Sequence, residues 1–106
     1  MPVIMTFRVQ GDPTRLEETA AANPERMSSI AERAIEYGLI AHRVYGSDDG
    51  QVMVVDEWPD AASFHRFYGE MQSQIEPLMR DTGIGGDPEI TFWRKLETHD
   101  DVGWGA

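Results

Sequence analysis

A short turn between two strand-like segments sets the strongest limit on the fold of this chain. Residues 39–45 and 51–58 carry many aliphatic and aromatic side chains, and the segment Gly-Ser-Asp-Asp-Gly, residues 46–50, separates them. An Asp-Gly step between two such segments is a strong signal for a β-hairpin. The two segments are therefore expected to be antiparallel neighbours in one sheet.

Strand and helix patterns flank this hairpin. Residues 3–9 alternate apolar and polar side chains, as a half-buried strand does. Residues 13–22 are interpreted as a short helix or irregular helical turn, and residues 24–37 as the main helix, which Gly38 ends. After the hairpin, Asp60 is expected to cap a further amphipathic helix, which Pro77 should kink or end.

The last part of the chain completes the pattern. Residues 90–96 alternate as a fourth strand, preceded by a loop rich in glycine and proline: Gly83, Gly85, Gly86 and Pro88. The order β-α-β-β-α-β predicts a ferredoxin-like α+β fold, with a four-stranded antiparallel sheet backed by two helices. A chain of 106 residues has room for one domain. We expect residues 1–96 to form that domain and residues 97–106 to form a polar tail.

Large apolar side chains fall on both faces of the predicted sheet. On the third strand Met53 and Val55 point to one face and Trp58 to the other, because successive side chains alternate. Phe92 and Trp93 likewise point to opposite faces. Helices on one face would leave a contiguous apolar patch on the other, which soluble monomers rarely expose. The chain is therefore expected to pair with a copy of itself through the open face.

Composition excludes several classes of function. Nine basic and nineteen acidic residues give a formal charge of −10, which disfavours binding to nucleic acid and to anionic membranes. The absence of cysteine excludes thiol catalysis, disulfides and iron–sulfur clusters. No metal-binding pattern is evident. With no signal-peptide pattern and no apolar run of the ~20 residues that cross a bilayer, a cytoplasmic protein is expected.

Residues 38–64 carry a resemblance to a known superfamily. A glycine, Gly38, precedes the second strand, and an acidic-x-Trp element, Asp56 and Trp58, ends the third strand before an amphipathic helix. This is similar to the dimeric α+β barrel superfamily, which includes the antibiotic biosynthesis monooxygenase-type domains, and the similarity extends over residues 3–96. That helix often carries a histidine in the superfamily. In register with Trp58 and Phe64, the histidine position is occupied here by Phe67.

The resemblance implies an activity. Relatives of this type often use no metal or organic cofactor, and a deprotonated substrate reacts with oxygen directly. The chain is accordingly expected to be a cofactor-independent, monooxygenase-like or isomerase-like enzyme that encloses a small hydrophobic or aromatic substrate in the barrel. The alternative hypothesis is a non-catalytic homodimer that binds a small ligand or is structural. An enclosed cavity beside a histidine would favour the enzyme.

Two histidines are the candidate catalytic residues. His42 shares a strand face with Ile40 and Val44, so it is either a hydrogen-bonded core histidine or a general acid or base. His65 lies on the flank of the apolar stripe of its helix, about 100° from Phe64, which is typical of a surface or interface residue. Some relatives degrade haem, and the resemblance makes His65 the available helix ligand for it.

The remaining candidates would contact the substrate. In the enzyme hypothesis, aromatic side chains form an apolar wall that excludes water, while Tyr45 and Arg43 hold oxygen atoms of the substrate. The same aromatic residues are also typical core or dimer-interface anchors. The predicted substrate-binding residues are Arg43, Tyr45, Trp58, Phe67, Phe92 and Trp93.

Overall fold

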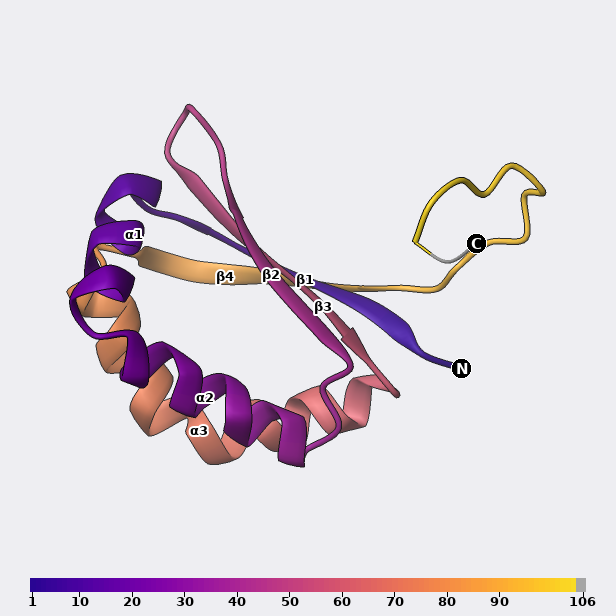
Figure 1. The fold of residues 1–106 in the computed structure, drawn as a ribbon, viewed down its shortest axis with the longest axis horizontal. Coiled ribbons are helices and arrows are strands. Elements are labelled where there is room, and N and C mark those ends of the chain that lie inside the picture. The colour runs from indigo at the N-terminus through magenta and orange to yellow at the C-terminus, as the bar shows by residue number, and fades with distance from the viewer. Residues whose placement is uncertain (105–106) are drawn as a thin grey trace.

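The computed structural model describes residues 1–104, which fold into a sheet backed by helices (Figure 1). In chain order its elements are β1 (Val3–Gln10), α1 (Pro13–Ala22), α2 (Pro24–Glu36), β2 (Ala41–Gly46), β3 (Gln51–Trp58), α3 (Ala61–Asp81) and β4 (Gly85–Trp93). The predicted ferredoxin-like α+β class is confirmed. The segment after β1 is a helix in its own right, so the order is β-α-α-β-β-α-β.

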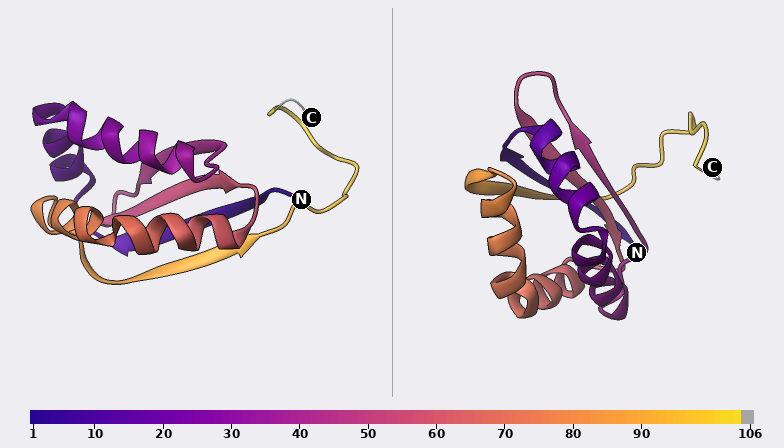
Figure 2. Two further views of the ribbon diagram at one scale, coloured as in Figure 1. Left: turned by 90° about the horizontal axis from the view of Figure 1, so that it is seen from below. Right: turned by 60° about the vertical axis from the view of Figure 1, so that its left-hand side comes forward.

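All strands of the sheet are antiparallel, in the order β2-β3-β1-β4. The predicted hairpin joins β2 to β3, and its turn is closed by a hydrogen bond of 2.9 Å from Ser47 N to Gln51 O. The helices lie on one side of the sheet and leave the other side open (Figure 2). The side facing the helices is called the inner face below, and the open side the outer face.

Local polar groups fix where the helices begin and end. The Asp12 carboxylate accepts a hydrogen bond from Thr14 N at 3.0 Å, and the Asp60 carboxylate accepts one from Ser63 N at 2.8 Å. At the end of α2, Gly38 has a φ of +110°, which favours glycine and turns the chain toward β2. The helix ends predicted at Gly38 and Asp60 are therefore present.

The predicted boundaries of two strands were wrong. β2 begins at Ala41 and not at residue 39. β4 spans Gly85–Trp93 and not residues 90–96, so Gly85, Gly86 and Pro88 lie within a strand and not in a loop. The early part of β4 pairs with β1 across a register shift, Gln10 opposite Gly85. An edge strand tolerates glycine and proline because only one of its sides must form the ladder.

Two further features concern chain direction. α3 continues through Pro77 to Asp81, and Figure 2 shows that this helix bends along its length, as the kink prediction requires. After β4, residues 94–104 form neither helix nor strand and extend away from the sheet (Figure 1). None of the helices in residues 1–104 is long and apolar enough to span a membrane.

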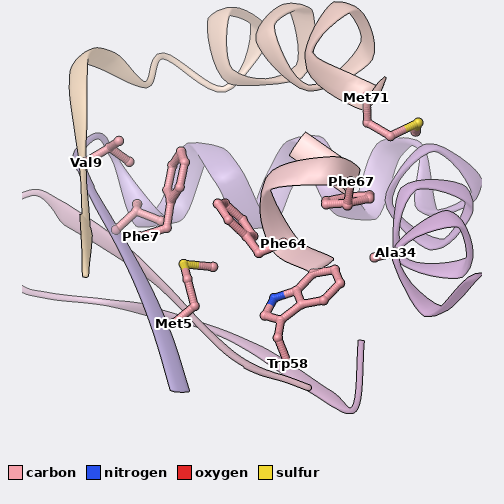
Figure 3. Packing of buried hydrophobic residues seen from close by; sticks show 9 residues of the cluster. Met5, Phe7, Val9, Ala34, Trp58, Phe64, Phe67 and Met71 are labelled. Atoms are coloured by element: carbon pink, nitrogen blue, oxygen red, sulfur yellow. The ribbon is translucent and has the colours of Figure 1, made fainter. Parts of the chain in front are cut away.

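The core lies between the inner face and the helices (Figure 3). Trp58 is fully buried, and the rings of Phe64 and Phe67 from α3 lie 5.9 and 5.6 Å from its ring. Burial of side chains of this size contributes roughly 1.5–3 kcal/mol each. The buried cluster consists of Met5, Phe7, Val9, Ala34, Val52, Trp58, Phe64, Phe67 and Met71.

Candidate functional site

A cavity lies between the inner face of the sheet and the helices. It has a volume of about 160 Å³, and its walls are mainly aliphatic and aromatic side chains of β1, β2, β3 and all three helices. Only four of its lining residues carry a polar side-chain group other than methionine sulfur: His42, Asp56, Tyr68 and Thr82. This cavity is thus on the helix side of the sheet, whereas the sequence analysis expected the substrate inside the barrel.

The polar groups begin with a hydrogen-bonded chain from the cavity into the core. His42 Nδ1 lies 2.6 Å from Asp56 Oδ1, and Trp58 Nε1 donates to Asp56 Oδ2 at 3.1 Å. The Asp56 side chain is only 7% exposed, whereas the His42 ring is 40% exposed. When His42 is neutral and donates from Nδ1 to the carboxylate, its Nε2 is left with a free lone pair. This is the arrangement that orients a histidine as a general base.

Sheet register explains why these three side chains meet. His42 on β2 is directly opposite Asp56 on β3, and both side chains point to the inner face. Trp58 lies two residues further along β3, so its side chain shares that face. Packing of the Trp58 indole against Phe64 and Phe67 then fixes the donor that holds Asp56.

Tyr68, which the sequence analysis did not single out, is the next polar group of the cavity. Its ring stacks on Phe64 at 5.6 Å with an interplanar angle of 13° and meets the edge of Phe7 at 5.9 Å. Burial raises the pKa of Tyr68, and the negative charge of Glu76 adds to this shift. The phenol is thus kept protonated, as a hydrogen-bond donor. Within residues 1–104 its hydroxyl makes no hydrogen bond to protein.

The fourth polar side chain of the cavity, Thr82, already has hydrogen-bond partners within the protein. Thr82 is fully buried at the end of α3, and its hydroxyl hydrogen-bonds to the carbonyl oxygens of Leu78 and Met79 at 3.0 and 2.9 Å. It therefore secures the end of the helix. His42 and Tyr68 remain as the groups able to act on a molecule in the cavity.

The other predicted catalytic residue, His65, lies elsewhere. It is exposed on α3, does not line the cavity, and its ring is 5.5 Å from Phe64 and 5.3 Å from Phe92. The structure therefore brings His42 to the wall of the cavity and leaves His65 outside it.

The predicted substrate-binding residues are divided between the two faces. Phe67 lines the cavity, and Trp58 lies behind its wall. Phe92 is on the inner face of β4 but packs with His65 outside the cavity. The remaining three, whose strand positions place them on the outer face, are Arg43, Tyr45 and Trp93.

A second, open depression of about 1660 Å³ lies at the other end of the sheet, beside the β2–β3 turn. Tyr45 lines it, and several of its charged side chains, Glu17, Asp48 and Asp87, are exposed to solvent. Arg8 forms an ion pair with Glu89, and Asp12 caps α1. We therefore regard the smaller, apolar cavity as the candidate site.

The residues present do not fit haem or a metal centre. The cavity is smaller than the ~300–1,000 Å³ of pockets that hold drug-sized ligands, and His65 lies outside it. Within the described part of the chain, no three His, Asp or Glu side chains gather as metal ligands would.

Comparisons with known proteins give a match only at the level of structure. No protein-family model and no curated sequence matches this chain. A cofactor-independent oxygenase from Streptomyces nogalater, SnoaB, superposes with a TM-score of 0.64 at 15% identity, over 94% of this chain and 98% of that one. A monooxygenase from Streptomyces coelicolor, solved with the ligand nanaomycin D, gives a TM-score of 0.65 at 18% identity, over 91% and 88%. A candidate antibiotic biosynthesis monooxygenase from Deinococcus radiodurans gives 0.61 at 17% identity, over 95% and 99%.

These matches cover nearly all of each chain, so the whole domain is shared. At such identities the likeness establishes the fold alone. Activity must be argued from the cavity and its polar groups.

Proposed function

We propose that this chain, whose fold is that of the antibiotic biosynthesis monooxygenase-like α+β barrels, is a cofactor-independent monooxygenase-like enzyme for a small hydrophobic or aromatic substrate. The observation that carries the proposal is the His42–Asp56 pair at the wall of an otherwise apolar cavity. A base beside an apolar space suits a reaction that begins with removal of a proton.

The geometry supports a simple division of roles. His42 Nε2 accepts the proton of the substrate, and the Asp56 carboxylate stabilises the imidazolium that forms. Trp58 keeps the carboxylate in place through its indole N–H. The apolar wall, which includes Phe67, limits reprotonation of the substrate anion by water. The anion itself then supplies electrons to oxygen, so that no further redox group takes part.

Oxygen consumption tests this proposal. We expect the protein to accelerate oxygen uptake by single-ring hydroquinones above the rate of their autoxidation without protein. His42→Gln should lower the rate by roughly 10²–10⁴-fold, the usual contribution of a general base. His65→Gln is the matched control, because that ring lies outside the cavity, and it should retain the activity. Uptake that is equal in the wild type, His42→Gln and the blank would contradict the proposal.

One observation favours a second candidate function, a non-catalytic ligand-binding homodimer. Phe67 occupies the helix position at which relatives often carry a histidine, and it packs on Trp58. In that case the same hydroquinones would bind and be recovered unchanged, with no oxygen consumed.

We also propose that two copies pair through the outer face. Ile4 and Trp93 are 38% and 53% exposed there, although both belong to strands of the sheet. The indole N–H of Trp93 donates to Thr6 Oγ1 at 2.8 Å, so the apolar ring is what the surface presents. Pairing would remove these groups from water.

We further propose bounds for the domain and a cellular location for the protein. Residues 1–96 are proposed as the domain and residues 97–106 as a tail, since β4 ends at Trp93; residues 105–106 of this tail lie outside the described residues. The lack of cysteine is consistent with a reducing compartment, and we propose a cytoplasmic location.

A further inference from the structure

We infer that Tyr68 is the second substrate-binding group of the site: it donates a hydrogen bond to an oxygen at the end of the substrate opposite to the end that His42 deprotonates. The inference rests on the proposed function for the role of His42. It adds a residue and a substrate geometry that the dyad alone does not define.

Tyr68 and His42 lie over different strands of the sheet. Tyr68 packs against Phe7, which belongs to β1, while His42 rises from β2. β3 lies between these two strands, so their axes are about 10 Å apart at the usual strand spacing. Both side chains nevertheless line the one cavity. A molecule held there therefore has the base on one flank and the phenol on another.

The Tyr68 hydroxyl is available to a ligand. Stacking on Phe64 fixes the plane of the Tyr68 ring, so its hydroxyl oxygen is held in that plane. Among residues 1–104 no protein group hydrogen-bonds to it, so this donor is free to bind a molecule in the cavity that the Tyr68 side chain lines. Donors of this kind act most strongly on an oxygen that gains negative charge in a site of low dielectric constant.

The volume of the cavity limits the size of the substrate. An apolar cavity of about 150 Å³ accommodates benzene, and the cavity here measures about 160 Å³. The substrate is therefore a single ring with an acidic O–H at one end and a conjugated oxygen acceptor in the para position. His42 Nε2 forms an N–H bond as the O–H bond breaks. The electron pair stays on the substrate and is delocalised toward the acceptor oxygen, to which Tyr68 donates.

4-Nitrophenol is a suitable probe, because its phenolate is yellow and its neutral form is not. We expect the wild type to bind it and to increase the phenolate fraction relative to free probe at the same pH. Tyr68→Phe should weaken binding about tenfold, as expected for one hydrogen bond to a charged acceptor, and should abolish most of the increase in phenolate. Tyr37→Phe is the matched control, since Tyr37 packs on Phe67 but does not line the cavity, and it should behave as the wild type.

4-Nitroanisole, which has no acidic proton, separates ionisation from simple burial. Its affinity should differ less between the wild type and Tyr68→Phe than that of 4-nitrophenol. The inference is overturned if the wild type fails to bind 4-nitrophenol or does not favour the phenolate, a result that requires no variant to fold. Equal binding and colour in the wild type and Tyr68→Phe would overturn it as well. If the Tyr68 effect is present and oxygen uptake is absent, the inference stands and the monooxygenase proposal fails.

Discussion

Among single residues, Asp56 holds the candidate site together. Its two carboxylate oxygens accept from His42 and from Trp58, and the side chain is nearly excluded from solvent. One acceptor group therefore determines which nitrogen of the histidine carries the proton.

Replacement of Asp56 by asparagine should invert the tautomer of His42. The single amide oxygen would accept from Trp58, and the amide NH₂ would then face His42 Nδ1, which must become an acceptor. Long-range ¹H–¹⁵N correlation spectra should show the proton on Nε2 of the neutral ring, with catalytic activity lost and the fold retained. Asp56→Ala is the comparison: it leaves the buried indole N–H unpaired and should cost about 1–3 kcal/mol of unfolding free energy. A spectrum with Nδ1 still protonated in Asp56→Asn would contradict this account.

At this scale the sequence predicted part of the site. Alternation along β2 placed His42 with Val44 on one face, and both line the cavity. The partner of His42 could not be assigned, because the His42–Asp56 contact depends on the register between two strands. Tyr68 was missed for a different reason. It follows Phe64 by one helical turn, so its spacing is the same as that of a core residue.

Among the elements, the junction between α2 and β2 determines where β2, the strand that carries His42, begins. Gly38 adopts its positive φ there, and a Cβ at this residue would lie 3.2 Å from Pro59 Cγ. Backbone strain and this close contact act in the same direction.

Gly38→Ala should destabilise the protein by about 1–3 kcal/mol, the usual cost of a side chain in a sparsely populated backbone region. Gly69→Ala is the matched substitution: Gly69 lies inside α3, and nothing is within 4 Å of the added Cβ. It should stabilise the protein by about 0.5–1 kcal/mol, because alanine favours a helix interior. Urea denaturation of both variants measures the difference. Equal stability of the two would show that the junction is not strained.

Some helix and strand boundaries could be predicted from the sequence, and others could not. The hairpin and the helix caps were predicted correctly because each depends on a few adjacent residues, such as Asp49-Gly50 or Asp60. The start of β4 was not, because Gly85 and Gly86 have no side chains to alternate. Gly85 joins the strand by pairing with Gln10 of β1, which is distant in sequence, and Gly86 has a φ of +82° beside the register shift.

For the whole molecule, the open question is what covers the outer face. Val55 lies near its centre, on β3 opposite Thr6 of β1. A charged side chain there would have to be buried in any face-to-face pair, at a cost that opposes pairing.

Light scattering should therefore give twice the chain mass for the wild type and the single chain mass for Val55→Asp. Ile35→Asp is the control, because Ile35 is 61% exposed on α2, away from the outer face, and this variant should remain a dimer. A monomeric wild type at micromolar concentration would refute the pairing.

The predicted substrate-binding residues are divided between the two faces of the sheet, and the reason lies in the arrangement of the whole molecule. Alternation placed Phe92 and Trp93 on opposite faces. It could not indicate which face encloses space, because that depends on how closely the helices approach the sheet. Arg43, Tyr45 and Trp93 were consequently grouped with Phe67, from which the sheet separates them.

The cavity is walled entirely by elements of a single chain, and this has a consequence for how ligands would titrate. In a face-to-face pair, two such cavities would lie back to back with both sheets between them, so neither would borrow a side chain from the other. Saturation should therefore reach one ligand per chain along a hyperbolic curve with a Hill coefficient of one. The monomeric Val55→Asp variant should give the same curve, since dissociation of the pair removes no part of either cavity.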